Sequence, residues 1–309
     1  MSMNVLRSTL IALSQNKRLR HFLEQSRVGQ KISGRFIAGM QVADALRVAE
    51  TLNREGIPVS LNSLGENVST EEDAQRAAQI YHQLLDAIQR RSLQANVSAK
   101  LTQMGMNIDP SIARRITSDL VDHAAAADSF LRVDMEGTDL TQATIDMTRE
   151  IHAMPNHGGR VGTVLQSYLY RCENDVHTLL ADGIRIRLCK GAYKEPPNLA
   201  FPNKRDVDAN YVKLMKILLT SGVYHGLATH DEAIIRATKK FVEEEGIDKR
   251  SFEFQMLYGV RRDLQSSLVK EGYGMRVYVP FGTEWYPYFM RRLAERPANF
   301  LFLAKNLLK

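Results

Sequence analysis

Cysteine is scarce in this sequence. Its 309 residues include two cysteines, Cys172 and Cys189, which are too few and too poorly spaced for a disulfide scaffold or a zinc site. Neither cysteine lies in an obvious catalytic context. A chain without structural disulfides suits a reducing compartment, so we expect this protein in the cytoplasm.

Long hydrophobic runs are also missing. The longest apolar stretches, LLTSGVYHGLA and ANFLFLAKNLL, are interrupted or shorter than the roughly 18 residues that a membrane-spanning helix needs. This argues against an integral membrane protein. Because 44% of the residues are hydrophobic, the chain can bury a sizeable core, and we expect a soluble globular protein of one large domain or two small ones.

The N-terminal segment lacks acidic residues until Glu24. Such a segment is typical of a transit peptide, but its apolar residues at helical spacing also predict a first structural helix, which is the interpretation we favour. It has neither a long apolar core nor a small-residue cleavage site, and this excludes a secretory signal. We therefore expect a helical arm over residues 1–56.

Charge of one sign is only slightly in excess. The 41 basic residues outnumber the 35 acidic ones by six, yet the two kinds are interleaved and form no long run. We therefore expect no nucleic-acid partner. A basic surface can bring a peripheral enzyme to the inner face of the cytoplasmic membrane, although a solvated exterior of mixed charge explains the same excess.

The sequence also lacks GxGxxG, the usual fingerprint of a doubly wound dinucleotide-binding domain. It has instead short segments of alternating apolar and polar residues, such as ANVSAKL, FLRVDME, VGTVLQSY and IRIRLCKGAY. Side chains on a strand alternate between its faces, so one face would be apolar and the other ionisable. Alternation is typical of an antiparallel sheet with one wetted face. Helical patterns separate these strands, however, which favours parallel strands with helical crossovers.

Eight strands are predicted along the chain, near residues 58–64, 95–101, 130–136, 161–168, 184–190, 226–230, 252–257 and 275–280. Thr70 is the predicted N-cap of the helix after the first strand, and Asp109 with Pro110 opens the helix after the second. Eight strand–helix units in roughly 250 residues predict an α/β fold of the (βα)8 TIM-type barrel class. We place the barrel over residues 57–309, within a single domain that spans residues 1–309.

The predicted site lies where the strands end, because active groups of a (βα)8 barrel gather there. The strand patterns place these polar residues at that end: Lys100, Asp134, Gln166, Arg187, His230, Gln255 and Tyr278. Burying unpaired ions is costly, so a charged pocket for a charged ligand explains the pattern better than an ordinary core. An internal ion-pair network that holds the barrel together is the alternative.

Guanidinium groups recur near the end of the chain. The segment PYFMRRLAER, residues 287–296, predicts a helix with Pro287 in its first turn, and it carries Arg291, Arg292 and Glu295. Guanidinium groups suit bidentate recognition of a carboxylate, which indicates an amino-acid or carboxylic-acid ligand beneath this helix. Taken alone, such a pair of arginines is more often simply solvated at the surface.

Several motifs occur in an order and spacing that make a resemblance specific. They are GRFIAG (34–39), SLNSLGE (60–66), VSAKLTQMG (97–105), RVDMEG (132–137), LQSYLYR (165–171), RLCKGAYKEP (187–196), ATHD (228–231), FEFQMLYG (252–259), RVYVPFG (276–282) and RRLAERPAN (291–299). Together they resemble the proline dehydrogenase family over nearly the whole chain. The resemblance implies a distorted TIM-type barrel that holds FAD non-covalently and oxidises L-proline to Δ1-pyrroline-5-carboxylate. Hydride would pass to flavin N5 and the electrons to a membrane quinone, as the first step of proline catabolism to glutamate.

The resemblance also implies a role for individual residues. Asp134 and Arg187 would be the active-site pair, with Arg187 stabilising the electron-rich reduced flavin. The proline carboxylate would be bound by Lys100, Arg291 and Arg292, and the pyrrolidine ring would pack on Tyr193, Leu257 and Tyr278. Cofactor contacts would come from Met135, Gln166, Arg187, Lys190, Gly191, Ala192, Thr229, His230 and Glu295.

Some positions carry alternatives. A lysine at a strand end, such as Lys100, equally suits a Schiff-base aldolase. The bulk of Tyr278 suits unsubstituted proline, whereas a flavoenzyme for hydroxyproline or another cyclic amino acid would need room there. Asn62 stands where the family usually has an acidic residue, so neutral hydrogen bonds would replace an ion pair. Glu66 is expected to pair with Arg291 as a gate that closes on substrate.

Two further expectations concern partners. The chain ends just after the barrel, so we expect a monofunctional enzyme, with a separate pyrroline-5-carboxylate dehydrogenase as a plausible partner. An inactive barrel that serves as a binding or regulatory module is the alternative from a different class, and it predicts a colourless protein.

Overall fold

The computed structural model describes residues 34–65, 68–193 and 195–295, which form a closed barrel of eight parallel strands. Neighbours in the barrel are neighbours in the chain, and the last strand pairs with the first. The strands are β1 (Val59–Ser63), β2 (Ala95–Lys100), β3 (Leu131–Asp134), β4 (Val161–Gln166), β5 (Arg185–Cys189), β6 (His225–Ala228), β7 (Phe252–Leu257) and β8 (Gly274–Phe281). All eight predicted strands and the TIM-type barrel are confirmed.

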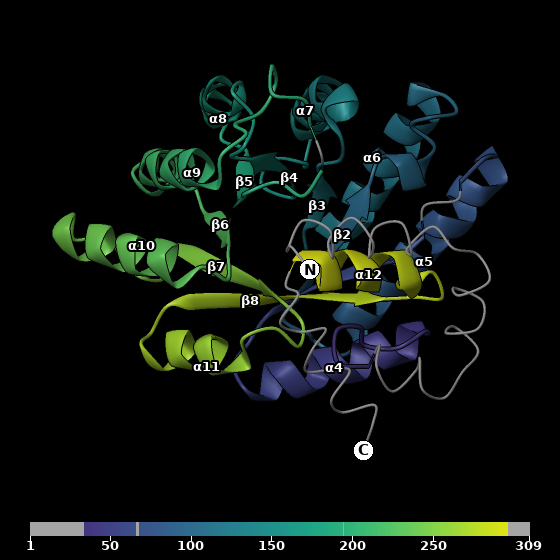
Figure 1. Ribbon diagram of the computed structural model, residues 1–309. Helices are drawn as coiled ribbons and strands as arrows, with labels where there is room; N and C mark the ends of the chain where they lie inside the picture. The colour runs from purple at the N-terminus through teal and green to yellow at the C-terminus, as the bar shows by residue number, and fades with distance from the viewer. Residues whose placement is uncertain (1–33, 66–67, 194, 296–309) are drawn as a thin grey trace.

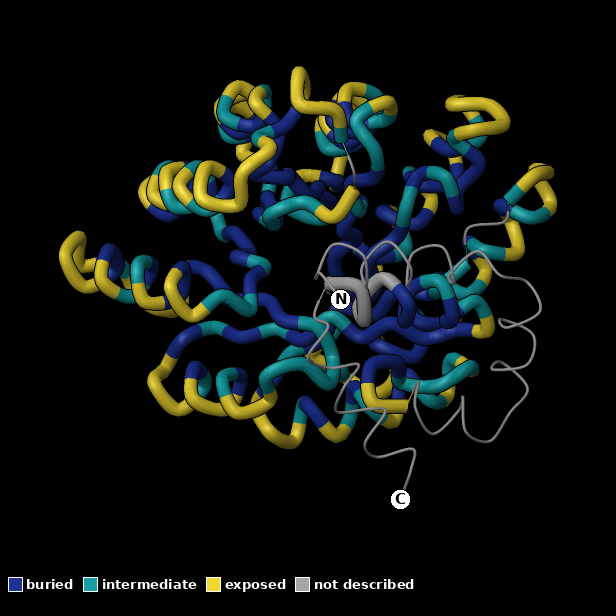
Figure 2. Tube along the Cα trace, viewed as in Figure 1, coloured by how far each residue is buried: buried dark blue, intermediate teal, exposed yellow. Residues whose placement is uncertain are grey.

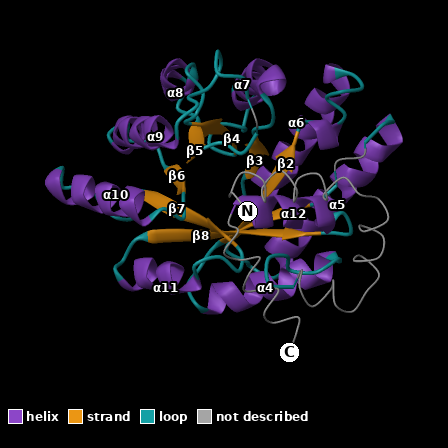
Figure 3. Cartoon of the chain, viewed as in Figure 1, coloured by secondary structure: helices purple, strands orange, loops and turns teal. Residues whose placement is uncertain are grey.

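Helices connect consecutive strands and surround the barrel, with one more helix before the first strand and another after the last (Figures 1 and 3). They are α4 (Val42–Arg54), α5 (Glu71–Arg90), α6 (Pro110–Ala126), α7 (Thr138–His152), α8 (Cys172–Ala181), α9 (Lys204–Leu219), α10 (Glu232–Glu244), α11 (Arg262–Lys270) and α12 (Trp285–Glu295), with a short 3-10 turn η1 (Thr102–Met104) after β2. Along the described residues, no helix combines the length and apolarity needed to cross a bilayer.

The predicted helix starts are confirmed by their caps. Thr70 accepts a hydrogen bond from the backbone N–H of Asp73, and the Asp73 side chain accepts one from the backbone N–H of Thr70. Asp109 accepts from the backbone N–H of Ser111 at 2.7 Å, ahead of Pro110 in the first turn of α6. These local signals set where the crossover helices begin, and so where the loops at the strand ends lie.

The two faces of each strand have different surroundings. Apolar residues of the strands form one core with the buried faces of the helices, and three of them, Val97, Val133 and Ile186, are at most 2% exposed. Figure 2 shows this buried layer inside exposed outer helix surfaces. Polar residues point the other way, because side chains from strands on different sides of the barrel contact one another, such as Tyr278 and Asp134. The polar interior predicted from alternation is confirmed.

The helix α12 packs on a separate apolar cluster. Trp285 and Phe289 of α12 make an edge-to-face contact at 5.7 Å between ring centroids, and Phe36 lies 6.1 Å from Phe289. Leu64 and Val260, which follow β1 and β7, pack against the same cluster. Because these residues follow strand ends, α12 lies at the carboxyl end of the barrel, where the site was predicted.

The N-terminal arm is described only in part. Helix α4 and the segment that precedes it from residue 34 are the described portion of the arm expected over residues 1–56. Residues 1–33 lie outside the described part of the chain. The division into an arm and a barrel at residue 56 therefore stays a prediction.

Candidate active site

An ion pair occupies the barrel interior between β3 and β5. The Arg187 guanidinium donates to Oδ1 of Asp134 at 2.8 Å, and the two side chains are only 7% and 13% exposed. Ser98 on β2 donates its hydroxyl to the same oxygen at 2.6 Å. A buried pair is stable only where hydrogen bonds satisfy the remaining polar atoms, and this pair meets that condition.

The remaining donors of Arg187 are held as well. Its Nε donates to Oε1 of Gln255 at 2.5 Å, and its two terminal nitrogens donate to the hydroxyls of Ser98 at 3.1 Å and Ser60 at 3.2 Å. The guanidinium also lies 5.2 Å from the centroid of the Tyr278 ring, within the range of a cation–π contact. Contacts from β1, β2, β7 and β8 thus fix one cation in one orientation.

Tyr278 completes the cluster from β8. Its hydroxyl donates to Oδ2 of Asp134 at 3.0 Å, so that both oxygens of the carboxylate accept hydrogen bonds. Burial, followed by the negative charge of Asp134, holds the pKa of Tyr278 well above its usual value. The phenol therefore stays protonated and remains a donor at neutral pH.

A second charged layer lies below this cluster. Arg276 donates to Oε1 of Glu253 at 2.7 Å, and the same oxygen accepts from the Gln255 amide at 2.6 Å. Burial alone would raise the pKa of Glu253, but the neighbouring Arg276 and the hydrogen bonds lower it overall. The internal ion-pair network considered as an alternative is therefore present, and it supports the upper cluster through Gln255.

Two glycines make room for these side chains. A Cβ atom on Gly226 would lie 2.4 Å from the Gln255 amide nitrogen, and one on Gly162 would lie 2.9 Å from a terminal nitrogen of Arg132. Neither glycine was predicted as a site residue, and Ser60 was also missed. Only the register of the barrel reveals them, because an isolated glycine in a strand usually indicates a bulge or a close backbone approach.

The residues expected around the substrate meet at the carboxyl ends of the strands. Lys100 is the last residue of β2 and pairs in register with Asp134, while Leu257 ends β7 opposite Tyr278. Tyr193 lies on the loop after β5 and is 42% exposed. Asn62 is buried and donates to the carbonyl of Ser98 at 2.8 Å. The neutral hydrogen bond expected of Asn62 is confirmed.

Residues expected at the cofactor follow β4, β5 and β6. Oε1 of Gln166 is buried, and no hydrogen-bond partner for it occurs among the described residues. Gly191 has φ +106°, and a Cβ atom there would lie 2.4 Å from the Tyr168 ring. An unsatisfied buried acceptor beside a backbone that only glycine allows fits the predicted contact with a large polar cofactor.

The loop after β6 orients its own polar groups. Nε2 of His230 accepts from the backbone N–H of Leu257 at 2.9 Å, which assigns the ring proton to Nδ1 in a neutral imidazole. The backbone N–H of Thr229 donates to the carbonyl of Gln255 at 3.1 Å, and its hydroxyl accepts from the N–H of Asp231. This hydrogen bond orients the His230 ring, and contact of His230 with the cofactor stays a prediction.

Lys190 is already bound by carboxylates. Its ammonium lies 2.7 Å from Asp231 and 2.5 Å from Asp208. Burial raises the pKa of Asp231, but the hydrogen bond and charge of Lys190 outweigh it and bring the value down to about 2. Met135 is buried at the end of β3 and Ala192 follows Gly191. Direct cofactor contact by these residues stays a prediction.

Comparison with known proteins agrees with this arrangement. A family model described as proline dehydrogenase matches residues 45–305. The chain belongs to the proline dehydrogenase family. It is 39% identical to proline dehydrogenase 1 of Bacillus subtilis subsp. natto over 307 residues, covering 99% of this chain and all of that protein. It is 40% identical to the proline dehydrogenase of Deinococcus radiodurans over 288 residues, covering 90% of each chain.

Solved structures agree in fold. Proline utilization A from Bdellovibrio bacteriovorus superimposes with a TM-score of 0.82 at 24% identity, over 94% of this chain. This proline dehydrogenase family member spans only 36% of that longer protein. At this identity the likeness supports the barrel alone, and the family assignment rests on the sequence matches.

The carboxylate-binding residues expected on the last helix are described only by their place. Arg291, Arg292 and Glu295 lie on α12, at the carboxyl end of the barrel, but their side chains lie outside what the structure describes. Glu66 also lies outside the described residues. The gate between Glu66 and Arg291 stays a prediction.

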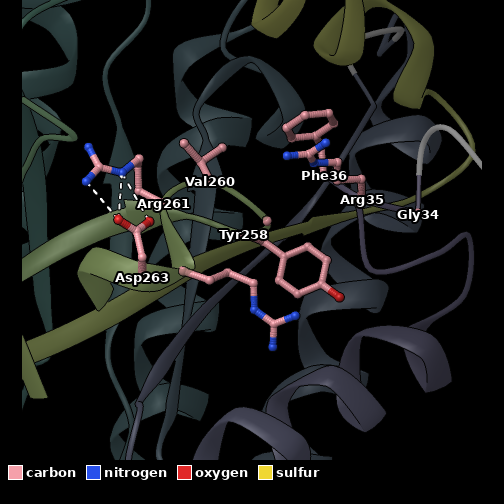
Figure 4. A pocket seen from close by; sticks show the side chains of 9 residues that line it. Gly34, Arg35, Phe36, Tyr258, Val260, Arg261 and Asp263 are labelled. Atoms are coloured by element: carbon pink, nitrogen blue, oxygen red, sulfur yellow. Dashed lines mark hydrogen bonds and ion pairs between the residues drawn. The ribbon is translucent and has the colours of Figure 1, made fainter. Parts of the chain in front are cut away.

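A separate cavity of about 470 Å³ lies beside the end of β7 (Figure 4). Its walls are residues 34–36 and 258–263, and Arg261 is paired there with Asp263 and Glu232. Gly259 permits this packing, because a Cβ atom would overlap the carbonyl of Arg35 at 1.6 Å. The backbone of Arg35 therefore packs directly against the loop that follows Leu257, at one wall of this cavity.

Proposed function

We propose that this protein oxidises L-proline to Δ1-pyrroline-5-carboxylate with FAD as its cofactor. Family membership supports the reaction, and the cluster of Asp134, Arg187 and Tyr278 is the observation that carries the proposal. It combines a fixed cation, a fixed carboxylate and an aromatic ring in a barrel interior where the Arg187 and Asp134 side chains are largely buried. Such a preorganised site suits a reaction in which charge develops at one place.

The residues present fit the cofactor. Gln166 offers an unsatisfied buried acceptor, Gly191 offers a backbone without a side chain, and the His230 ring is oriented by the backbone N–H of Leu257. We propose that these residues, with Met135, Lys190, Ala192, Thr229 and Glu295, hold FAD. Bound FAD would supply the acceptor for the two electrons that proline loses.

The chain's own groups would orient the substrate. Lys100 is a point charge at the end of β2, and with Arg291 and Arg292 it would bind the proline carboxylate. Leu257 and Tyr278 lie side by side in register and would pack on the ring, with Tyr193 closing from the loop. Holding the reacting carbon in one place in this way contributes to the rate by removing the entropy cost of alignment.

Arg187 has the electrostatic role. The proline C–N bond becomes a C=N bond when the ring carbon loses a hydride to the acceptor that bound FAD would supply and the amine loses a proton. Hydrogen bonds hold the Arg187 guanidinium on several sides, so it does not need to move as negative charge develops. It therefore stabilises the electron-rich product without reorganisation of the site. Tyr278 remains a neutral donor throughout, because its pKa is held well above its usual value by burial.

We further propose a membrane quinone as the electron acceptor and a separate pyrroline-5-carboxylate dehydrogenase as the consumer of the product. The first experiment is the visible absorption spectrum of the purified protein, recorded before and after anaerobic addition of L-proline. Flavin bands that bleach with proline, and much less with hydroxyproline, are the expected result. A protein that cannot be reconstituted with FAD, or a bound flavin that ignores proline, would overturn the proposal.

A further inference from the structure

Among the described residues, the barrel interior contains more cations than carboxylates. Asp134 pairs with Arg187 and Glu253 pairs with Arg276. Arg132 on β3 is 4% exposed, yet no carboxylate of the described residues lies within ion-pair distance of it. A buried charge without a counter-ion is costly, so it is rarely retained for packing alone.

Backbone carbonyls hold this unpaired cation. One terminal nitrogen of Arg132 donates to the carbonyls of Thr163 at 2.9 Å and Arg185 at 2.6 Å, and the guanidinium lies 4.7 Å from the centroid of the Phe130 ring. Its Nε is buried, with no hydrogen-bond partner in the described part of the chain. Gly162, the register partner of Arg132, leaves the space that the guanidinium fills. The surrounding carbonyls and the Phe130 ring thus accommodate the Arg132 cation, but they carry no formal negative charge that neutralises it.

The unpaired charge lies under the candidate active site. Arg132 and Asp134 are two residues apart on β3 and so point to the same face, and Ser98 pairs in register with Arg132 while bonding both Asp134 and Arg187. Burial, and then repulsion from Arg187, lowers the pKa of Arg132, whereas Glu253 and Asp134 act in the opposite direction. A guanidinium keeps its proton even so. The positive charge is therefore felt by the groups directly above it.

We propose that Arg132 tunes the reaction electrostatically from beneath Arg187, favouring the electron-rich reduced state of the cofactor without touching substrate. The inference rests on the proposed function. It assigns to the reaction a residue that the family resemblance did not. The competing explanation is a purely structural role, because the Arg132 side chain connects β3 to the backbones of β4 and β5 through hydrogen bonds.

Two substitutions distinguish an electrostatic role of Arg132 from a purely structural one. Arg132→Gln keeps amide donors near the two carbonyls but removes the charge, and Arg132→Lys keeps the charge but loses the planar fork. Arg185→Gln is the matched control: Arg185 occupies the same face of β5 below Arg187 and stacks on Phe130 and Tyr224, but it is only half-buried. Water screens a partly exposed charge, so its removal should matter less.

The measurement is the two-electron reduction potential of the FAD-loaded protein, with urea unfolding of each variant beside it. We expect Arg132→Gln to lower the potential by on the order of 30 mV, which is tenfold in the equilibrium constant for a two-electron couple. Arg132→Lys should stay near the wild type, and Arg185→Gln should shift the potential by clearly less than Arg132→Gln does.

Equal reduction potentials in Arg132→Gln and the wild type would overturn the inference and leave the structural role of Arg132 as the explanation. If Arg132→Gln does not fold, Arg132→Met provides a second neutral side chain. Failure of both neutral variants to fold, while Arg132→Lys folds, would assign the charge to folding and equally overturn the inference. A wild-type protein whose flavin ignores proline would defeat the proposed function instead, so the two failures are distinguishable.

Discussion

The hydroxyl of Tyr278 donates to Oδ2 of Asp134 at 3.0 Å, joining β8 to β3 across the barrel interior. The opposite oxygen of the carboxylate accepts from Arg187, whose guanidinium lies under the Tyr278 ring. The three side chains therefore form one unit, and substitutions within it should show strongly non-additive effects. This coupling makes the role of each residue testable.

Tyr278 should control discrimination between proline and hydroxyproline. Tyr278 pairs in register with Leu257, and its hydroxyl is held by Asp134, so we expect the ring to resist moving aside for an extra hydroxyl. Replacing Tyr278 with Ser opens that space, and we expect the ratio of kcat/KM for hydroxyproline over proline to rise by about tenfold. Steady-state kinetics on both substrates measures the ratio.

The control variant is Tyr278→Phe. It keeps the ring and removes only the hydroxyl, which should cost about 1 kcal/mol of unfolding free energy through the lost hydrogen bond. The substrate ratio should stay near the wild-type value. If Tyr278→Phe shifts the ratio as far as Tyr278→Ser does, the ring is not the element that excludes the hydroxyl.

The Asp134–Arg187 pair should be strongly coupled in stability. Arg187→Met leaves the Asp134 carboxylate buried without its counter-ion, and we expect the unfolding free energy to fall by about 3–5 kcal/mol. Adding Asp134→Asn to that variant should recover part of the loss, because the unpaired charge is then gone. Urea unfolding of the two single variants and the double variant gives the coupling energy.

A surface pair provides the comparison for this cycle. Arg114 and Glu150 lie 2.7 Å apart with side chains 46% and 53% exposed, and the cycle of Arg114→Met with Glu150→Gln should give about 0–1 kcal/mol. Similar coupling energies for the Asp134–Arg187 and Arg114–Glu150 pairs would mean that solvent screens the buried pair more than its low exposure indicates.

The barrel and much of the site could be predicted from the sequence because both depend on local pattern. Alternation within segments such as FLRVDME fixes which side chains share a face, and helical stretches between strands require parallel pairing. These two facts predict that Asp134 and Arg187 share one barrel interior, although Arg187 lies in the middle of β5 and not at its end, where the pattern placed it.

What the sequence could not predict depends on register between strands. Gln255 reaches Arg187 only because Gly226, on the strand between them, has no side chain to block it. Likewise, the sequence did not predict that the Lys190 ammonium contacts Asp231, which lies 41 residues later in the chain. Contacts of this kind arise from the closed barrel, so a single strand carries no sign of them.

Gly226 should support the site through Gln255. In Gly226→Ala the new methyl group would lie 2.4 Å from the Gln255 amide nitrogen, so Gln255 must shift away from Arg187. Overpacking of this kind costs about 1–3 kcal/mol of unfolding free energy. We also expect kcat for proline oxidation to fall, because Arg187 loses the acceptor of its Nε.

Gly158 gives the matched glycine control. A Cβ atom on Gly158 has no neighbour within 4 Å among the described atoms, and its φ is not in the left-handed range. Gly158→Ala should change the unfolding free energy by less than about 0.5 kcal/mol. A wild-type turnover number in Gly226→Ala would show that the contact from Gln255 is dispensable.

His225 should make the fold sensitive to mild acid. It is fully buried on β6, where Nδ1 accepts from the backbone N–H of Ile186 at 3.0 Å and Nε2 lies 3.0 Å from the Ser221 hydroxyl. Burial, and then the positive charge of Arg132, lowers the pKa of His225 to about 3. The ring is therefore neutral in the folded protein under conditions where the unfolded chain is already protonated.

The sign of the pH effect follows from this difference. The unfolded state takes up a proton near pH 6.5 and the folded state does not, so stability is complete above that pH and falls as the pH drops toward 3. Between pH 7 and pH 5 the contribution of this group should be about 2 kcal/mol. His225→Asn keeps an oxygen that can accept from Ile186 but does not titrate. Between pH 7 and pH 5, the unfolding free energy of His225→Asn measured in urea should therefore fall by about 2 kcal/mol less than that of the wild type. The variant should nevertheless be less stable than the wild type at pH 7. Parallel pH profiles for the two proteins would mean that the imidazole gains a proton inside the barrel.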